Sequence, residues 1–357
     1  MNRFDYIRPA SVPEAIAAGA APGSVYLAAG TNLLDLMKGA VAQPERIVDI
    51  TRLPGLDRID WLPGGDVRIG ALVRNADLAY DMRFARTFPA VAEALLSGAS
   101  PQLRNAATVG GNLMQRTRCA YFHDLASACN RRAPGSGCDA RDGENRLHAV
   151  LGWSESCVAT HPSDFSVPLV ALDAVIEVEG PAGAREIAVA ALHSLPGTTP
   201  ERETVLAPGE LILALRIPVR AAAFARHARY LKLRERASYA FAVVSAAAAL
   251  ELEAGVIREA RIALGGVAAK PWRANEAELS LAGINPTREA FLKAAELALA
   301  EARPSGDNAF KIELARRIVM RALTLALEGT PAVMPALPAS PFSAIPEAKL
   351  FGANHVA

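Results

Sequence analysis

The sequence predicts an α+β protein with more than one domain. Its 357 residues suffice for two or three domains, and 51% of them are hydrophobic, so a large core can be buried. Short strands and helices alternate in the first half, whereas a strand hairpin followed by clustered helices fills the later part. Strands followed by grouped helices are typical of α+β organisation. We therefore divide the chain near residue 222, into residues 1–222, residues 223–330 and an irregular, proline-rich tail at 331–357.

The first 50 residues predict a compact β-α-β-like unit. "SVPEAIAAGA" is typical of a helix with Ser11 as its N-cap and Pro13 in its first turn. "SVYLAAG" predicts a buried strand that ends in glycine. The next segment, "TNLLDLMKGA", predicts a helix capped by Thr31, and "RIVDIT" predicts the second strand.

Later segments follow the same logic. Residues 75–98 predict helical structure, and the small, polar "SPQLRNAATVGGNLMQ" after them predicts a loop. "SVPLVALDAVIEVEG" predicts a helix followed by a strand, and "ELILALRIPV" predicts a further strand. A linker is expected at 219–229 and a hairpin turn at Glu253-Ala254-Gly255. Three helices are expected to follow, at about 273–282, 287–302 and 308–328.

Charge and hydropathy exclude several classes of protein. The net charge is +1 with acids and bases intermixed, which argues against a nucleic-acid-binding surface. The longest apolar run, residues 237–250, is shorter than the roughly 20 residues needed to span a bilayer. The N-terminus lacks the apolar core of a signal peptide. We expect no membrane span, and any export from the cytoplasm would depend on another protein.

Two glycine-containing segments indicate a possible nucleotide cofactor site. "YLAAGTNLLDL" and "NAATVGGNLM" place small residues and backbone N–H groups where the chain leaves a strand. Successive N–H groups in such turns bind anions, and two such turns would suit a diphosphate. Neither segment is a G-x-G-x-x-G fingerprint or a phosphate-binding P-loop. Ordinary tight turns remain the alternative interpretation of each.

The four cysteines lie close together in the sequence, at 119, 129, 138 and 157. Two disulfides would suit a small secreted domain rather than a chain of this size. A zinc site usually brings C-x2-C pairs, which do not occur here. An iron–sulfur cluster needs four converging thiolates, with spacings that differ between families. On the residues alone, all three readings stay open.

The surroundings of the cysteines favour an anionic centre. Several arginines could offset the charge of thiolates and sulfides, and "APGSG" could supply bends and N–H groups. These arginines are Arg116, Arg118, Arg131, Arg132 and Arg141. His123 and His161 flank the segment, but we expect them to be hydrogen-bonding loop residues and not ligands.

Several of these motifs, in order, resemble a known family. "YLAAGTNLLDLMK", "ATVGGNLMQ" and "SDFSVPLVALDA" are similar to the FAD-binding subunit of the xanthine dehydrogenase and molybdenum aldehyde oxidoreductase family. The resemblance covers about residues 1–330. It implies a two-part FAD-binding domain of the vanillyl-alcohol-oxidase or PCMH type, followed by a smaller domain like the C-terminal domain of CO dehydrogenase flavoproteins. The cysteine segment, at about 116–160, resembles an insertion in the flavin subunit of periplasmic aldehyde oxidoreductases, where four cysteines bind a [4Fe–4S] cluster.

The resemblance implies a set of FAD-binding residues. The first glycine loop would hold the diphosphate, Asp164 would bind the ribityl or adenosine side, and Ile212 would pack near the flavin. Lys232 would lie near the isoalloxazine ring and stabilise reduced, anionic flavin, although a solvated strand residue is the alternative. Ala28-Ala29 replaces a Val-Gly-Gly pattern, which is tolerable if one position alone must lack a Cβ atom. The remaining implied contacts are Tyr26, Leu27, Gly30, Thr31, Asn32, Leu33, Leu34, Thr108, Gly110, Gly111, Asn112 and Thr117. The implied cluster ligands are Cys119, Cys129, Cys138 and Cys157.

The resemblance also implies partners. A small subunit with two [2Fe–2S] clusters and a large subunit with molybdopterin would complete a heterotrimer. This complex would oxidise aldehydes, aromatic ones in particular, and pass electrons through FAD to an external acceptor. Such a complex is expected in the periplasm by co-export with a signal-bearing partner, or in the cytoplasm without one. Two alternatives are a flavin subunit of a 4-hydroxybenzoyl-CoA reductase-like or xanthine dehydrogenase-like enzyme and, in another class, a zinc-binding scaffold or assembly protein without FAD.

Overall fold

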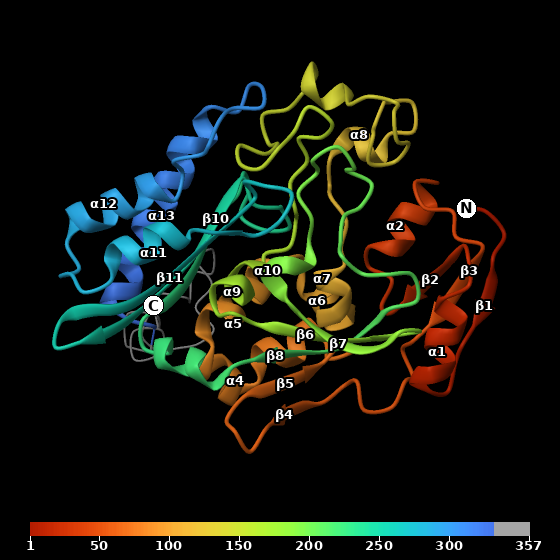
Figure 1. The fold of residues 1–357 in the computed structure, drawn as a ribbon, viewed down its shortest axis with the longest axis horizontal. Coiled ribbons are helices and arrows are strands. Elements are labelled where there is room, and N and C mark those ends of the chain that lie inside the picture. The colour runs from red at the N-terminus through yellow and green to blue at the C-terminus, as the bar shows by residue number, and fades with distance from the viewer. Residues whose placement is uncertain (332–357) are drawn as a thin grey trace, which may run out of the picture.

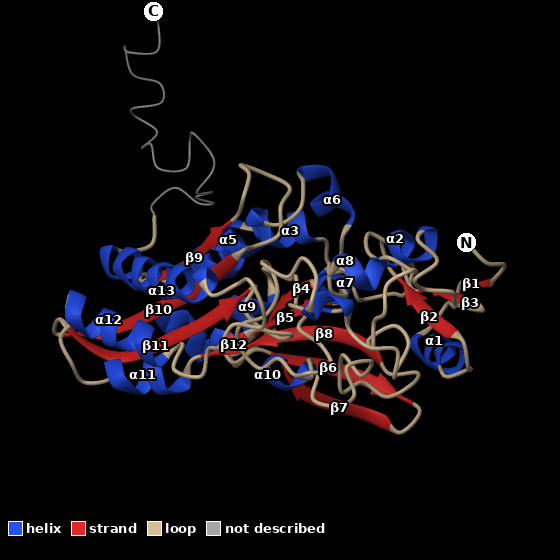
Figure 2. Cartoon of the chain, turned by 90° about the horizontal axis from the view of Figure 1, so that it is seen from above, coloured by secondary structure: helices blue, strands red, loops and turns tan. Residues whose placement is uncertain are grey.

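A computed structural model describes residues 1–331 and contains three β-sheets with helices packed on them (Figure 1). The three sheets follow one another across the molecule, with the N-terminal sheet at one end and the C-terminal sheet at the other (Figure 2). This confirms the predicted α+β class. The predicted tail lies, apart from residue 331, outside the described residues. Within residues 1–331, no helix combines the length and hydropathy that crossing a membrane requires.

The N-terminal sheet confirms the predicted β-α-β unit. Its three strands are parallel in the order β1-β3-β2, which requires the helical crossover between β2 and β3. Ser11 caps the first helix as predicted, since its hydroxyl accepts the Glu14 N–H at 3.4 Å. The bounds are β1 (Asp5–Ile7), α1 (Val12–Gly19), β2 (Ser24–Leu27), α2 (Leu33–Lys38) and β3 (Arg46–Asp49).

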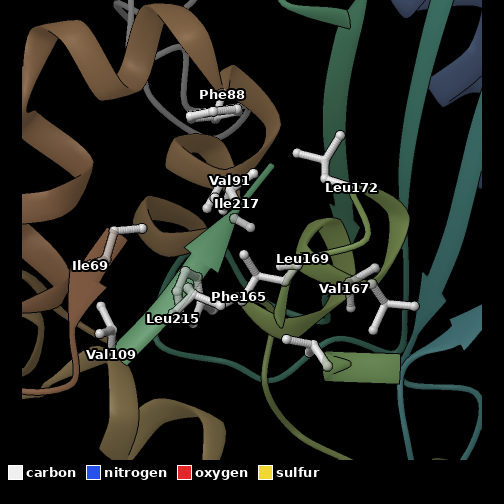
Figure 3. Close-up of a cluster of buried hydrophobic side chains, with 14 of the residues drawn as sticks. Ile69, Phe88, Val91, Val109, Phe165, Val167, Leu169, Leu172, Leu215 and Ile217 are labelled. Carbon is white, nitrogen blue, oxygen red and sulfur yellow. The ribbon is translucent and has the colours of Figure 1, made fainter. Parts of the chain in front are cut away.

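The central sheet has five antiparallel strands in the order β4-β5-β8-β6-β7. Side chains of β5 and β8, including Ile69 and Leu215, pack with Phe88, Val91 and Phe165 in one buried cluster (Figure 3). The elements around it are β4 (Ile59–Trp61), β5 (Val67–Gly70), α3 (Asn75–Tyr80), α4 (Met82–Thr87), α5 (Pro89–Ser97), α9 (Ser166–Ala171), β6 (Val175–Gly180), β7 (Gly183–Ala188), α10 (Val189–Leu192) and β8 (Leu211–Ile217).

Two predictions for residues 75–115 need correction. The region 75–98 is helical but broken into three helices, because extended Asp81 caps α4 and Pro89 starts α5. The predicted loop at 100–115 instead forms α6 (Pro101–Ala106) and α7 (Val109–Leu113). Ser100 and Thr108 begin these helices, since each hydroxyl accepts a backbone N–H of the first turn.

The C-terminal sheet is antiparallel in the order β12-β11-β10-β9, and the predicted hairpin is confirmed. Ala254 and Gly255 both have positive φ, as a tight two-residue turn requires. The expected linker at 219–229 contains the 3-10 helix η2 (Val219–Phe224), so the boundary near residue 222 stays a prediction. The bounds are β9 (Ala228–Leu233), β10 (Val244–Glu253), β11 (Val256–Gly265), β12 (Trp272–Arg273), α11 (Asn275–Leu281), α12 (Arg288–Leu297) and α13 (Phe310–Glu328).

Strand β10 is buried on both faces. Ala247 and Ala249 belong to the core shared with the central sheet, whereas Ala246 and Ala248 belong to the core under α11 to α13. Successive side chains of a strand point to opposite faces, so the alternation follows from strand geometry. Because alanine is small, α13 packs closely on one face of β10 and α9 on the other.

The cysteine segment, residues 116–160, has little regular structure beyond α8 (Ala120–His123) and the 3-10 helix η1 (Asp139–Arg141). Figure 1 shows it along the top of the molecule, between α2 and the end of the C-terminal sheet. The start of the segment is hydrogen-bonded to the N-terminal unit, since the Arg116 N–H donates to Asn32 Oδ1 at 3.0 Å. Closer to its end, the segment is hydrogen-bonded to the C-terminal domain, since the N–H groups of Val150 and Leu151 donate to the Val267 carbonyl. The segment therefore contacts both flanking parts of the fold.

Candidate cofactor sites

The first glycine loop, residues 26–34, follows strand β2. Gly30 has φ +75°, and it alone in this range has positive φ, which explains why Ala28-Ala29 is compatible with the loop. A Cβ at Gly30 would lie 2.9 Å from Leu34 Cδ1, a contact that a shift of this exposed leucine side chain could relieve, so the positive φ is the stronger reason for glycine. The predicted Thr31 cap is wrong. Asn32 occupies the N-cap position of α2, and its side chain makes no capping bond.

The second glycine segment is the first turn of α7. Thr108 Oγ1 accepts the Gly111 N–H at 3.2 Å. A Cβ at Gly110 would lie 2.9 Å from the Ala71 Cβ, so Gly110 allows α7 to pack on the end of β5. Gly111 is exposed, and an added Cβ would meet Thr108 Oγ1 alone within 4 Å. The open side of α7 is therefore at Gly111.

The structure brings the two glycine segments together. The chain leaving α7 reaches the first loop through the Arg116 N–H bond to Asn32. Within residues 1–331, the Asn32 Nδ2 atom is buried without a hydrogen-bond partner. Residues 26–33 are partly exposed, although they include the end of a strand. An unsatisfied buried donor beside an uncovered strand end fits a bound polar group, because burying such a donor unpaired costs free energy.

Asp164 and Lys232 form a buried ion pair. Lys232 Nζ donates to Asp164 Oδ2 at 2.7 Å and to the Ser97 carbonyl at 3.1 Å, and its side chain is 3% exposed. The alternative of a solvated strand residue is therefore wrong for Lys232. Tyr230, two residues earlier on β9, donates to Asp164 Oδ1 at 2.6 Å. Burial raises the pKa of Tyr230 well above its usual value, so the phenol remains a donor.

Asp164 lies beside the second glycine segment. The adjacent Ser163 hydroxyl donates to Asn112 Oδ1 at 2.8 Å. Of the other implied contacts, Ile212 is buried in the same core cluster as Val109 of α7, and Thr117 donates to the Thr160 carbonyl at 2.9 Å. Thr117 lines the cavity between the cysteines, and its hydroxyl makes hydrogen bonds with Thr160 and Cys119.

All four cysteines are free and line one small cavity. Cys129 and Cys157 are buried, and Cys119 and Cys138 are partly buried. Burial raises the pKa of the Cys119 thiol to about 11 and also raises that of Cys138. Within residues 1–331, no three His, Cys, Asp or Glu side chains are placed to hold a single metal ion. The four cysteines that lie close together in the sequence therefore also converge in the fold, and none of them forms a disulfide.

Polar groups surround this cavity. Arg131 Nη2 lies 3.7 Å from Cys157 Sγ, His148 Nε2 lies 3.2 Å from Cys119 Sγ, and the Ala159 N–H donates to Cys157 Sγ at 3.5 Å. Such donors are what a sulfur-rich anionic centre requires. Sequence reasoning missed His148, because nothing in "NRLHAV" indicates that its ring turns back towards a cysteine 29 residues earlier.

The expected roles of the other arginines need correction. Arg116, Arg118 and Arg141 pair with carboxylates, and Arg132 donates to backbone carbonyls. The "APGSG" stretch supplies bends, with positive φ at Gly135 and Gly137, and the Ser136 hydroxyl accepts the Cys129 N–H. These residues shape the loop instead of bonding to sulfur.

The two histidines set aside from the sequence both make hydrogen bonds, as expected. His123 Nε2 lies 3.1 Å from the Thr117 carbonyl, and His161 Nε2 lies 3.1 Å from Ser166 Oγ. His161 also contacts His193, with ring centroids 4.1 Å apart and the ring planes tilted by 48°. Burial lowers the pKa of all three, so the rings favour the neutral form.

Comparison with known families decides the affiliation. Residues 2–220 match the FAD binding domain in molybdopterin dehydrogenase, and residues 229–326 match the CO dehydrogenase flavoprotein C-terminal domain. The chain belongs to this family. The predicted resemblance and two-part fold are confirmed, and FAD is the cofactor that the family binds.

Individual relatives extend over most of the chain. It is 46% identical to the aldehyde oxidoreductase FAD-binding subunit PaoB of Escherichia coli (strain K12), covering 90% of this chain and 98% of that protein. It is 30% identical to the carbon monoxide dehydrogenase medium chain of Hydrogenophaga pseudoflava, covering 91% and 97%. A chain of the reconstituted CO dehydrogenase from Oligotropha carboxidovorans superposes with a TM-score of 0.73 at 27% identity, covering 92% and 99%. This family member is thus the FAD-binding subunit of a molybdenum-dependent oxidoreductase.

Proposed function

We propose that this chain is the FAD- and [4Fe–4S]-containing electron-transfer subunit of a heterotrimeric molybdenum aldehyde oxidoreductase. The observation that supports the cluster is the convergence of four free cysteines on one cavity. In the part of the chain that the structure describes, no three potential ligands are placed for a single metal ion. A cubane cluster presents a separate iron to each thiolate, so its ligands stand further apart than those of zinc. The 46% identity with an aldehyde oxidoreductase subunit supports the reaction class.

The residues of this chain would form two sites, one for FAD and one for the cluster. Asn32, Thr108 and Gly111 would hold the FAD diphosphate, and the Asp164–Lys232 pair would place a buried cation near the flavin. Cys119, Cys129, Cys138 and Cys157 would hold the cluster, with Arg131 and His148 bonded to two of the sulfurs. A flavin exchanges one or two electrons and so can pass them to acceptors of either kind.

The aldehyde chemistry would take place on a partner. A large molybdopterin subunit would convert the aldehyde and water to a carboxylic acid, two electrons and two protons, and a small subunit with two [2Fe–2S] clusters would carry the electrons onward. The electrons would leave for an external acceptor by way of this chain. We further propose that the complex reaches the periplasm on the export signal of a partner, or remains in the cytoplasm if no partner carries one; fractionation of cells that produce the complete complex tests the location.

Cofactor analysis of the purified complex tests the proposal. We expect one FAD per trimer and, in Cys129→Ala, the loss of about four irons while the [2Fe–2S] signals in low-temperature electron paramagnetic resonance persist. Ser127→Ala is the matched control, because its hydroxyl bonds Asp124 and the residue does not line the cavity. Loss of zinc in place of iron would support the zinc-binding alternative, and unchanged iron in Cys129→Ala would end the cluster assignment.

A further inference from the structure

Arg131 is a buried cation next to a cysteine sulfur. Its side chain is 6% exposed, and Nη2 lies 3.7 Å from Cys157 Sγ. Of the arginines in the described cysteine segment, Arg131 is the one whose hydrogen bond reaches a sulfur. Water screens a buried charge poorly, so the field of this guanidinium at the cysteine cavity is strong.

Glu203 pairs with the terminal nitrogen of Arg131 that does not face Cys157. Its Oε2 accepts Arg131 Nη1 at 2.8 Å, and its Oε1 accepts Arg116 Nε at 2.6 Å. Glu203 comes from the segment between α10 and β8, far from the cysteines in sequence. The carboxylate orients Arg131 towards the sulfur and at the same time offsets part of its positive charge.

We propose that Arg131 sets the reduction potential of the centre held by the four cysteines, and that Glu203 is the positioning residue that limits its effect. The inference rests on the proposed function, in which that centre is a [4Fe–4S] cluster. Addition of one electron from a reductant makes the thiolate-ligated cluster more negative by one charge, and no bond forms or breaks. A fixed cation beside Cys157 stabilises the reduced form more than the oxidised form, because the net charge and the hydrogen bonds at sulfur determine the potential.

Removing the charge of Arg131 and removing that of Glu203 should therefore shift the midpoint potential in opposite directions. Arg131→Gln removes the cation and should shift the midpoint potential of the cluster to lower values. Arg131→Lys keeps the charge and should shift it less than Arg131→Gln does. Glu203→Gln leaves the cation in place without its offsetting carboxylate and should shift the potential to higher values. A purely structural role for either residue would not produce shifts of opposite sign.

The experiment is a redox titration of the purified complex with dithionite and a set of mediator dyes, followed by low-temperature electron paramagnetic resonance. Arg141→Gln is the matched control, because Arg141 lies near Cys138 in sequence but pairs with Glu155, and we expect no shift. Iron and FAD are measured on every variant. If Arg131→Gln fails to retain its cluster, Glu203→Gln and Arg131→Lys still decide the matter.

The outcomes distinguish failure of the proposed function from failure of the inference about Arg131 and Glu203. Wild-type complex without the extra iron would refute the proposed function itself. Iron present, with potentials in Arg131→Gln and Glu203→Gln that match wild type or shift in the same direction, would overturn the inference and leave the cluster assignment intact. Opposite shifts with unchanged iron and FAD would support it.

Discussion

The C-terminal sheet and the cysteine segment, although in contact, are held together in different ways. Strand β10 is buried from Val244 to Leu250, with apolar neighbours on both faces. The cysteine segment is held by hydrogen bonds: Arg132 donates to carbonyls within the segment, and Asn145 and Lys311 make hydrogen bonds that join it to the C-terminal domain. A cavity lies within the segment. Apolar packing stabilises the sheet without any ligand, whereas the segment surrounds a space that four thiols line.

The largest effect on stability is expected from the sheet. Leu264→Ala removes a fully buried side chain of β11 and should lower the free energy of unfolding by about 2–5 kcal/mol, since a cavity replaces the lost atoms. Denaturant unfolding followed by circular dichroism measures it. Leu279→Ala is the control, because Leu279 is 75% exposed on α11 and should change stability by less than about 0.5 kcal/mol. Equal effects of the two substitutions would contradict the packing account.

Lys311 connects the two regions and gives a smaller, more local effect. Its buried ammonium donates to the carbonyls of Leu147, His148 and Gly266 at 2.7–2.8 Å. Lys311→Met leaves these acceptors without their donor and should cost about 1–3 kcal/mol, with faster proteolysis near residues 145–149. Lys293→Met, at an exposed position of α12, should leave both the unfolding curve and the cleavage pattern unchanged. Cleavage elsewhere in the chain would show that Lys311 does not anchor this segment.

The smallest expected effect on stability distinguishes cofactor binding from folding. Thr108 and Thr287 both act as N-caps, each accepting a backbone N–H at 3.2 Å. Replacing either with alanine should cost about 1 kcal/mol. Thr108→Ala should also reduce the FAD retained after desalting, because α7 carries the second glycine segment, whereas Thr287→Ala should retain wild-type FAD. Equal FAD content in both variants would show that the diphosphate does not bind at α7.

The same contrast explains what the sequence could predict. The hairpin turn, the helices after it and the Ser11 cap follow from local pattern, so they were predictable from a few neighbouring residues. The cysteines were predictable as a group, because nothing but their clustering was needed. Whether the site residues contact FAD and the cluster as implied by the resemblance stays a prediction.

Other features depend on contacts between distant residues, and sequence pattern did not reveal them. Lys232 can be buried because its ammonium donates a hydrogen bond to Asp164, 68 residues earlier. Arg131 is oriented by Glu203. His148 is held in place because Asn308 and Lys311 donate hydrogen bonds to its backbone carbonyl. The helices at 101–113 were missed because glycine and polar residues favour loops, whereas here the hydroxyls of Ser100 and Thr108 satisfy the first-turn N–H groups.

Hydrogen exchange on wild-type complex and Cys129→Ala tests most directly whether the cysteine segment depends on a bound centre while the sheet does not. Few large apolar side chains stabilise residues 116–144, so loss of the centre should speed amide exchange in this segment. Residues 244–250 and 260–265 should exchange at the wild-type rate, because these parts of the hairpin are buried among apolar side chains. Unchanged exchange in the segment, or equal acceleration in both regions, would contradict the account.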